Sequence, residues 1–181
     1  INILCGLIRP SSGEIYLDST KIDEANLQSY QAKISAIFAD FYLFSQTLSR
    51  DGFASQSDIE GLLALLEIDK KVSVVDNKLS TTQLSTGQRK RLSLLIAILE
   101  RRSILILDEW AADQDPLFKR KFYKEILPFL QSKGVSVIAV SHDDIYFDVA
   151  TRIILVKDGF VRELDEAERI SAAKDAVEKI K

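Results

Sequence analysis

The sequence predicts an α/β domain built on a mostly parallel sheet. Two apolar runs, residues 104–107 and 135–140, have the length and composition of buried parallel strands. A helical pattern precedes the first run, and another connects it to the second. Because strands that alternate with such helices form parallel sheets, we expect a ligand site at the carboxyl ends of the strands.

The first elements along the chain are short. Residues 1–8 carry apolar side chains at helical spacing until Pro10 and Gly13 break the pattern, which indicates the end of a helix. Residues 14–18 alternate in polarity and predict a short strand. Residues 34–38 predict a second, apolar strand.

A region with a weaker pattern follows. It opens with an aromatic cluster that fits either the core or a contact surface: Phe38, Phe41, Tyr42 and Phe44. Asp58 can cap a helix whose apolar residues, through Ile68, fall on one broad face. A polar stretch, residues 76–83, ends this region.

The second half of the chain is more regular. A turn at Leu84 opens a helix that reaches about Arg101. Asp115 and Pro116 form an N-cap and first-turn pair for the connecting helix, and Gly134 ends it.

The carboxyl end predicts a hairpin and a tail. Residues 153–156 and 160–164 flank Asp158-Gly159, which is a strong signal for a two-residue turn. Residues 165–181 predict a charged helix.

Composition excludes several classes of protein. The chain is 46% hydrophobic and 28% charged, which is typical of a globular domain with a core. Its net charge of −3 gives no basic excess, so we expect no nucleic-acid partner. Its single cysteine excludes an internal disulfide. No apolar run approaches the ~20 residues that cross a bilayer. Because the sequence contains no methionine, we expect it to be a fragment.

Two carboxylates follow the first apolar run directly. Asp108 and Glu109 would lie at the carboxyl end of a central strand, where a hydrated Mg²⁺ ion and a phosphate can bind. Acids at this position are about as often helix caps or surface charges, so the pair needs supporting motifs.

Two further features support the pair: a turn that opens the preceding helix, and a histidine at the same edge of the sheet. The turn at residues 84–88 contains Ser85 and Gly87, and the first backbone N–H groups of a helix can hold an anion there. A plain helix cap is the alternative. His142, the one histidine, follows the second buried run just as Glu109 follows the first, so both side chains can point into one crevice. A lone histidine is otherwise usually structural or on the surface.

In this order, the motifs resemble those of the nucleotide-binding domain of ATP-binding cassette (ABC) transporters. LSTGQ at residues 84–88 looks like the signature motif, with Thr86 in place of the first glycine. ILILDE at residues 104–109 looks like the Walker B motif followed by the catalytic glutamate. Asp115 matches the D-loop aspartate, and His142 matches the switch histidine.

Three segments narrow the resemblance to a subfamily. EWAADQDP, FYLF and SHDDIYF, at residues 109–116, 41–44 and 141–147, look like the exporters of cyclic peptides and pyoverdine-type siderophores. In that subfamily a transmembrane domain precedes this domain in the same polypeptide. The resemblance therefore implies a location at the cytoplasmic face of the cell membrane.

The resemblance also implies a mechanism and a set of site residues. ATP would bind between two copies of the domain arranged head to tail. Asp108 would hold Mg²⁺ through water, and Glu109 and His142 would be catalytic. The resemblance assigns contacts with ATP to one further group of residues: Ser85, Thr86, Gly87, Gln88 and Asp115.

The chain departs from the family pattern in two places. Ala39 stands where most members have the Q-loop glutamine. No GxxxxGKS or GxxxxGKT occurs, so we expect the phosphate-binding P-loop before Ile1. Residues 1–181 then form a P-loop NTPase (ABC ATPase) domain without its amino-terminal part, with a helical subdomain at about residues 45–100.

Two rival functions remain at this point. An SMC-type ATPase head, from the genome-maintenance class, shares the motifs but requires a long coiled coil before the signature, and residues 44–83 contain no heptads. A non-catalytic, shortened ABC module is favoured only if Ile1 is the true terminus.

Overall fold

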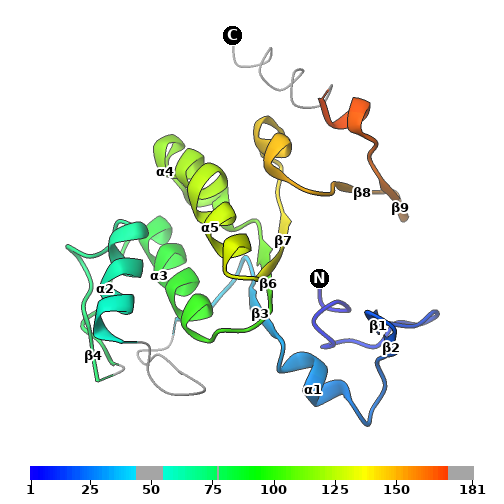
Figure 1. Ribbon diagram of the computed structural model, residues 1–181, viewed down its shortest axis with the longest axis horizontal. Coiled ribbons are helices and arrows are strands. Elements are labelled where there is room, and N and C mark those ends of the chain that lie inside the picture. Colours follow the sequence, from blue (N-terminus) through cyan, green and yellow to red (C-terminus); the bar gives the residue numbers. More distant parts are fainter. Residues whose placement is uncertain (44–54, 77, 171–181) are drawn as a thin grey trace.

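The computed structural model describes residues 1–43, 55–76 and 78–170, and its centre is a three-stranded parallel sheet (Figure 1). The strands lie in the order β3 (Ile34–Ile37), β6 (Ile104–Asp108) and β7 (Ser136–Val140). Both neighbouring pairs are parallel. The predicted fold class is therefore confirmed.

The central strand β6 divides the core into two parts. Leu105 and Leu107 belong to the larger cluster of buried side chains, whereas Ile106 belongs to a smaller one with Cys5 and Ile34. Successive side chains of a strand point to opposite faces of the sheet, so β6 contributes to both clusters. This burial on both faces holds the end of β6 in place.

The edge strand β7 differs from the sequence prediction. Ile138 pairs with Ile106 of β6, but Ile138 and Val140 are 41% and 39% exposed, so the prediction of a buried strand was wrong. Within the described residues, β6 pairs with one edge of β7 and no strand pairs with the other. Apolar composition alone does not distinguish a central strand from an edge strand that lacks a cover.

One nearly continuous helical segment connects β6 to β7, as predicted. It consists of α4 (Pro116–Lys121), the π-helical turn η2 (Phe122–Ile126) and α5 (Leu127–Ser132). The wider turn lies just before Pro128, which has no N–H for an ordinary helical hydrogen bond. Gly134 follows with a φ of +78° and ends the segment.

The amino-terminal elements are shorter than predicted. Leu7 donates to the carbonyl of Asn2, Gly6 donates to that of Ile3, and Gly6 has a φ of +67°, which together form a Schellman helix end. The helix end therefore lies at Gly6, before the predicted stop. Beyond it, two hairpin strands and one helix follow: β1 (Tyr16–Leu17), β2 (Thr20–Lys21) and α1 (Leu27–Gln31). The sequence analysis missed β2 and α1.

The helical layer beside the sheet contains α2 (Gln56–Leu65) and α3 (Thr86–Leu99). Ser55 caps α2, and Asp58 is the third helical residue, which completes a capping box, so the prediction that Asp58 is the cap was wrong. A small hairpin, β4 (Val74–Val75) and β5 (Lys78–Leu79), overlaps the predicted polar stretch.

The predicted carboxyl-terminal hairpin is confirmed. It consists of β8 (Ile154–Lys157) and β9 (Phe160–Glu163), joined by Asp158 and Gly159, both with positive φ. Residues 166–170 of the predicted tail are helical, and the rest of that tail lies outside the described residues. Within the described ranges, no helix combines the length and apolar character that crossing a membrane requires.

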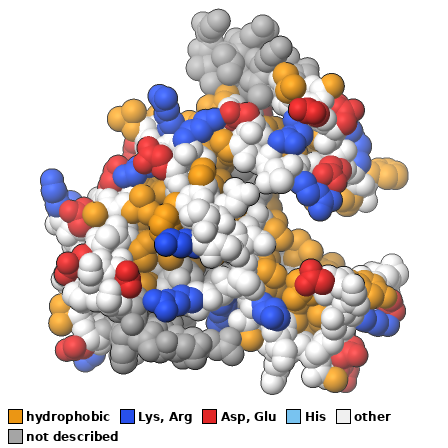
Figure 2. Space-filling model, in the orientation of Figure 1, with side chains coloured by type: hydrophobic (Ala, Val, Ile, Leu, Met, Phe, Trp, Pro, Cys, Tyr) orange, Lys and Arg blue, Asp and Glu red, His pale blue; other side chains and the backbone are white. Residues whose placement is uncertain are grey.

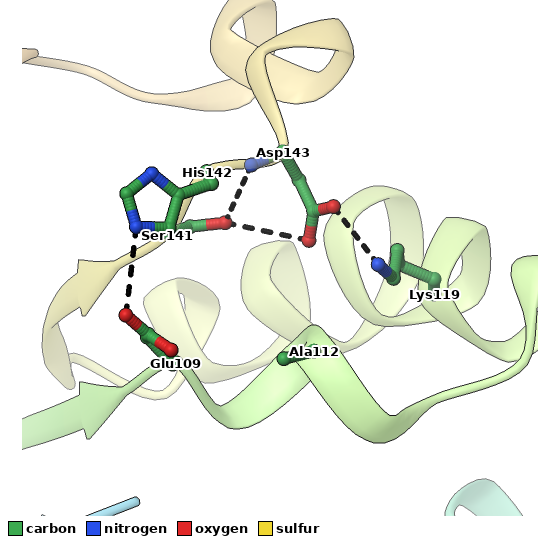
Figure 3. A pocket seen from close by; sticks show the side chains of 6 residues that line it. All are labelled: Glu109, Ala112, Lys119, Ser141, His142 and Asp143. Carbon is green, nitrogen blue, oxygen red and sulfur yellow. Dashed lines mark hydrogen bonds and ion pairs between the residues drawn. The ribbon is translucent and has the colours of Figure 1, made fainter.

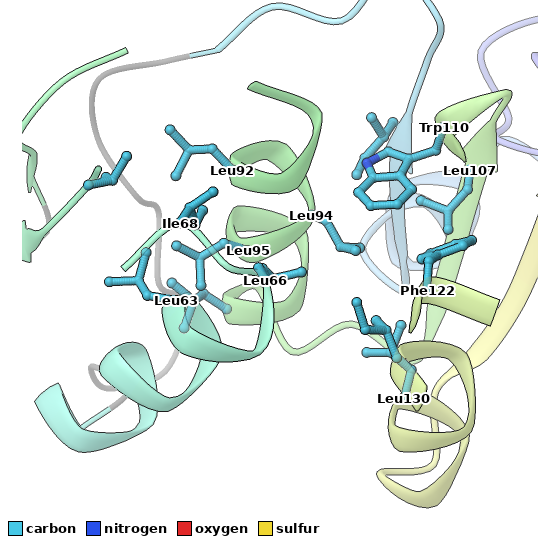
Figure 4. Close-up of a cluster of buried hydrophobic side chains, with 14 of the residues drawn as sticks. Leu63, Leu66, Ile68, Leu92, Leu94, Leu95, Leu107, Trp110, Phe122 and Leu130 are labelled. Atoms are coloured by element: carbon cyan, nitrogen blue, oxygen red, sulfur yellow. The ribbon is translucent and has the colours of Figure 1, made fainter. Parts of the chain in front are cut away.

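The larger core cluster holds α3 against the sheet and against the helical segment that connects β6 to β7 (Figure 4). Leu94 and Leu95 of α3 are fully buried, and Trp110 lies 4.5 Å from Phe122 between ring centroids. The helix that begins at the predicted signature turn is thereby fixed to the end of β6.

We expect Leu94→Ala to lower the free energy of unfolding by about 3 kcal/mol, because it removes buried methyl groups and leaves a cavity. Urea unfolding followed by the fluorescence of Trp110, the one tryptophan, measures this loss. Leu117→Ala is the matched control, since Leu117 is 82% exposed and its loss should cost less than about 0.5 kcal/mol. Equal losses in both variants would contradict the assigned core.

Candidate functional site

A pocket lies at the carboxyl ends of β6 and β7 (Figure 3). Its lining comes from the end of β6, the helical turn η1 (Trp110–Asp113), α4 and the loop after β7: Glu109, Ala112, Lys119, Ser141, His142 and Asp143. This is the edge of the sheet at which a ligand site was expected. The loops that follow two neighbouring parallel strands meet here.

The structure brings Glu109 and His142 together in this pocket. His142 Nε2 lies 3.5 Å from Glu109 Oε1, and Figure 3 shows the two side chains pointing toward each other. The imidazole is 88% exposed and the carboxylate side chain 47%, so both are accessible to a ligand from solvent. A carboxylate and an imidazole at this distance can together accept and hold a proton.

The backbone of Glu109 adopts a left-handed conformation, with φ 47° and ψ 33°. Its N–H donates to the carbonyl of Val140 at 3.1 Å, so the residue still belongs to the ladder between β6 and β7. Left-handed backbone costs a non-glycine residue about 1–3 kcal/mol and is concentrated at functional sites. Here it turns the chain sharply from the strand into η1.

A second cluster fixes the loop that carries His142. Tyr123 Oη lies 2.6 Å from Ser141 Oγ and donates to Asp143 at 3.0 Å, and Lys119 pairs with Asp143 at 2.9 Å. Tyr146 stacks on the Tyr123 ring at 4.4 Å. Burial raises the pKa of the Tyr123 hydroxyl well above its ordinary value, and the Asp143 carboxylate acts in the same direction. The phenol is therefore a stable hydrogen-bond donor.

The turn at residues 84–88 begins α3. Ser85 is the N-cap and forms a capping box with Gln88, so the cap expected as the alternative is present. Ser85 and Thr86 are exposed, and Ser85, Thr86, Gly87 and Gln88 are all absent from the pocket lining. The structure thus places the signature-like turn apart from the Glu109–His142 pair of the same chain.

Gly87 packs against the segment that follows β6. A Cβ atom at Gly87 would lie 2.9 Å from the carbonyl oxygen of Asp113, and Gln114 donates to the Gly87 carbonyl at 3.1 Å. The resemblance assigned this glycine to contact with ATP. The structure gives it an additional role inside the chain.

Arg91 and Asp115 extend the same contact. Arg91 donates to Gln114 at 2.9 Å and to Asp115 at 2.7 Å, and its guanidinium lies 3.4 Å from the centre of the Phe118 ring. Asp115 is the N-cap of α4, as predicted. The Phe118 N–H that donates to Asp115, together with Arg91, lowers the pKa of its carboxyl group. Asp115 is thus ionised and engaged in structural contacts.

The residues present fit a magnesium ion held mainly by a nucleotide. Asp108 ends β6 and is half-buried next to Glu109, so one or two carboxylates are available at this edge. Among the described residues, no group of three or more metal-ligating side chains comes together. Mg²⁺ characteristically takes one or two protein carboxylates and completes its shell with water and phosphate oxygens.

Sequence reasoning missed Lys119 and Tyr123, which belong to the pocket and the cluster beside it. It also missed three residues that join α3 to the η1 turn: Lys90, Trp110 and Asp113. Lys90 is 3% exposed within α3, although a lysine in a helix normally reaches solvent. Its neighbours Arg89 and Arg91 are charged as well, so no local signal marks its burial. Its partners lie about twenty residues away in the chain, and no local pattern identifies them.

Comparisons with known proteins agree on one family. The sequence profile of the ABC transporter family matches residues 1–112. The ATP-binding protein SyrD of Pseudomonas syringae pv. syringae is 42% identical over 162 residues. That match covers 88% of this chain but only 29% of SyrD, so the chain spans less than a third of this relative.

Solved structures show the same fold. A dimeric ATP-binding cassette bound to ADP and phosphate has a TM-score of 0.66 at 24% identity, and the match covers 91% of this chain and 78% of the cassette. A bacterial Atm1-family ABC exporter with ATP bound has a TM-score of 0.75 at 15% identity, covering 97% of this chain and 34% of the exporter.

We expect Gly87→Ala to lower the free energy of unfolding by about 1–3 kcal/mol, because the added methyl group would press on the Asp113 carbonyl. Gly61→Ala is the matched control: Gly61 lies within α2 with open space around its Cβ position. There alanine should raise stability by about 0.5–1 kcal/mol. A stabilised Gly87→Ala variant would disprove the close packing of the turn.

Proposed function

The chain is an ATP-binding domain of the ABC transporter family, and we propose that it powers an exporter of peptide-like or siderophore substrates by hydrolysing ATP. The observation that carries the proposed hydrolysis is the Glu109–His142 pair, 3.5 Å apart at the carboxyl ends of β6 and β7. The exporter assignment is supported by the segments at residues 109–116 and 141–147, which look like that subfamily.

Each proposed catalytic role follows from a position in the pocket. Asp108, at the end of β6, would hold Mg²⁺ through water, and bound Mg²⁺ would offset the charge of the phosphate oxygens. The Glu109 carboxylate would accept a proton from the attacking water. His142 is exposed, so its imidazole can contact a terminal phosphate while its Nε2 atom orients the Glu109 carboxylate.

The phosphate-binding loop would come from sequence before Ile1. The exposed edge of β7 supports this, because it can accept a further parallel strand beside Ile138 and Val140. Figure 2 shows hydrophobic side chains along the hollowed side of the molecule, between the amino-terminal elements and the β8–β9 hairpin. A strand and helix that carry the loop would cover such a surface.

A second copy of the domain, arranged head to tail, would complete each site. Ser85 and Thr86 are exposed at the amino terminus of the 14-residue helix α3 and lie apart from the pocket of their own chain. A helix amino terminus favours a phosphate group. The turn at residues 84–88, with Asp115 next to it, would therefore face the ATP of the opposite site.

The remaining partner would be a transmembrane domain that precedes this domain in one polypeptide. The chain matches only 29% of SyrD, which leaves room in a similar protein for such a domain. The ATP-binding domain would then work at the cytoplasmic face of the cell membrane. Closure of two domains on ATP and their reopening after hydrolysis would drive transport.

In a protein that joins this sequence to a phosphate-binding loop, Glu109→Gln should abolish ATP turnover and retain ATP binding. The amide keeps the shape of the side chain but cannot accept the proton. Steady-state phosphate release and nucleotide retention measure the two properties. Glu125→Gln, on the exposed face of η2, is the matched control and should keep full turnover.

Near-normal hydrolysis by Glu109→Gln would remove Glu109 from the role of general base. A wild-type protein that binds ATP without turnover would instead favour a non-catalytic ABC module.

A further inference from the structure

Lys90 is a buried cation that the proposed chemistry does not use. Only 4% of its side chain is exposed, whereas the paired side chain of Asp113 is 47% exposed. Burial of an ammonium group is unfavourable unless it is paired and hydrogen-bonded. The contacts of Lys90 must therefore offset the cost of burying its charge.

The first contact is with the backbone of Glu109. Lys90 Nζ donates to the Glu109 carbonyl oxygen at 2.9 Å and lies 2.7 Å from Asp113 Oδ2. These two acceptors lie at the two ends of the η1 turn. One ammonium group thus bridges the turn that leads out of β6 and neutralises its acidic end.

The second is a return contact from the same turn. Trp110 is 1% exposed, and its indole N–H donates to the carbonyl oxygen of Lys90 at 2.8 Å. The tryptophan ring also packs on Phe122 in η2. Lys90 and Trp110 are therefore joined by a hydrogen bond. Lys90 contacts the carbonyl of the peptide unit between residues 109 and 110, and the Trp110 side chain anchors its other end.

We propose that Lys90 is a positioning residue that locks Glu109 in its left-handed backbone conformation and so directs the Glu109 carboxylate toward His142. Strained backbone persists only where surrounding contacts over-determine it. At Glu109 these contacts are the N–H bond to Val140 on one side and the Lys90 and Ala112 contacts to the carbonyl on the other. Loss of the Lys90 contact leaves this carbonyl with the Ala112 bond alone, so the peptide can rotate and the carboxylate can leave its place opposite His142.

The proposal rests on the proposed function only for its effect on turnover.

Because Lys90 is the fifth residue after the Ser85 cap, the same contact joins the signature-like turn of α3 to the general base of its own chain. Movement of α3 would thus be transmitted to Glu109 in part through this ammonium group.

Two substitutions separate positioning from simple packing. Lys90→Met keeps the apolar stem and removes the donor, whereas Lys90→Gln keeps a donor for the Glu109 carbonyl and removes the charge. Lys90→Met should fold, because Asp113 is half-exposed and can be solvated, and the Glu109 carbonyl keeps its bond from Ala112. Urea unfolding confirms folding for each variant.

The first readout is independent of ATP. His142 is the one histidine, so its ring ¹H–¹³C resonance is identified without ambiguity in the 181-residue chain. At fixed pH, Glu109→Gln should shift this resonance, Lys90→Met should shift it in the same direction, and Lys90→Gln should leave it near the wild-type position. A resonance that stays unmoved in Lys90→Met, or in Glu109→Gln, would overturn the proposal.

The second readout is turnover in the longer protein. Lys90→Met should lower kcat for ATP about tenfold or more and change KM less than twofold, because the base is misplaced and the nucleotide contacts remain. Lys90→Gln should restore most of the activity. Unchanged kcat in an active Lys90→Met protein would contradict positioning. An inactive wild-type protein would contradict the proposed function alone, and the His142 resonance would still decide the inference.

Discussion

The left-handed backbone of Glu109 is the constraint on which the arrangement of the site depends. β6 ends at Asp108. If the chain continued as an extended strand, the Glu109 side chain would lie on the face of the sheet opposite to that of Asp108. With φ at 47°, the chain turns into η1, and the Glu109 carboxylate reaches His142 at the end of β7. The core of the domain supports this one conformation, because Trp110 anchors the turn among Phe118 and Phe122.

The segment at residues 109–115, which begins with this constrained residue, is also joined to α3. Lys90, Arg91 and Gly87 contact this segment at three places: the Glu109 carbonyl, the Gln114 and Asp115 side chains, and the Asp113 carbonyl. Hydrogen bonds to charged groups are the stronger ones, and the two cations that donate them here, Lys90 and Arg91, are buried. The turn at residues 84–88 and the pocket that contains Glu109 are thereby connected through contacts within one chain.

Much of the site could be predicted because its signals are local. Asp108 and Glu109 follow a strand in sequence, Asp115 precedes Pro116, and Ser85 precedes a helical pattern, so position alone located them. The pocket edge followed from the rule for parallel strands. The hairpin at Asp158-Gly159 was found because a two-residue turn demands positive φ.

The rest depends on contacts between distant residues. The pattern of apolar residues is the same for a central strand and for the exposed strand β7, since exposure depends on which other strands are present. Lys90 carries no local mark of burial, because its partners Glu109 and Asp113 are brought to it only by the fold. The left-handed backbone of Glu109 is likewise set by tertiary contacts and opposes the preference of the residue itself.

Replacement of Glu109 by glycine and by alanine tests this constraint most directly. Both variants lose the same carboxylate, so the difference in their free energies of unfolding reports the backbone alone. If Glu109 is held at a φ of 47°, the glycine variant should be more stable than the alanine variant by about 1 kcal/mol in urea unfolding of the 181-residue chain. In ordinary helix or strand backbone, alanine is more stable than glycine by about 0.5–1 kcal/mol. The same order at position 109 would contradict a left-handed Glu109.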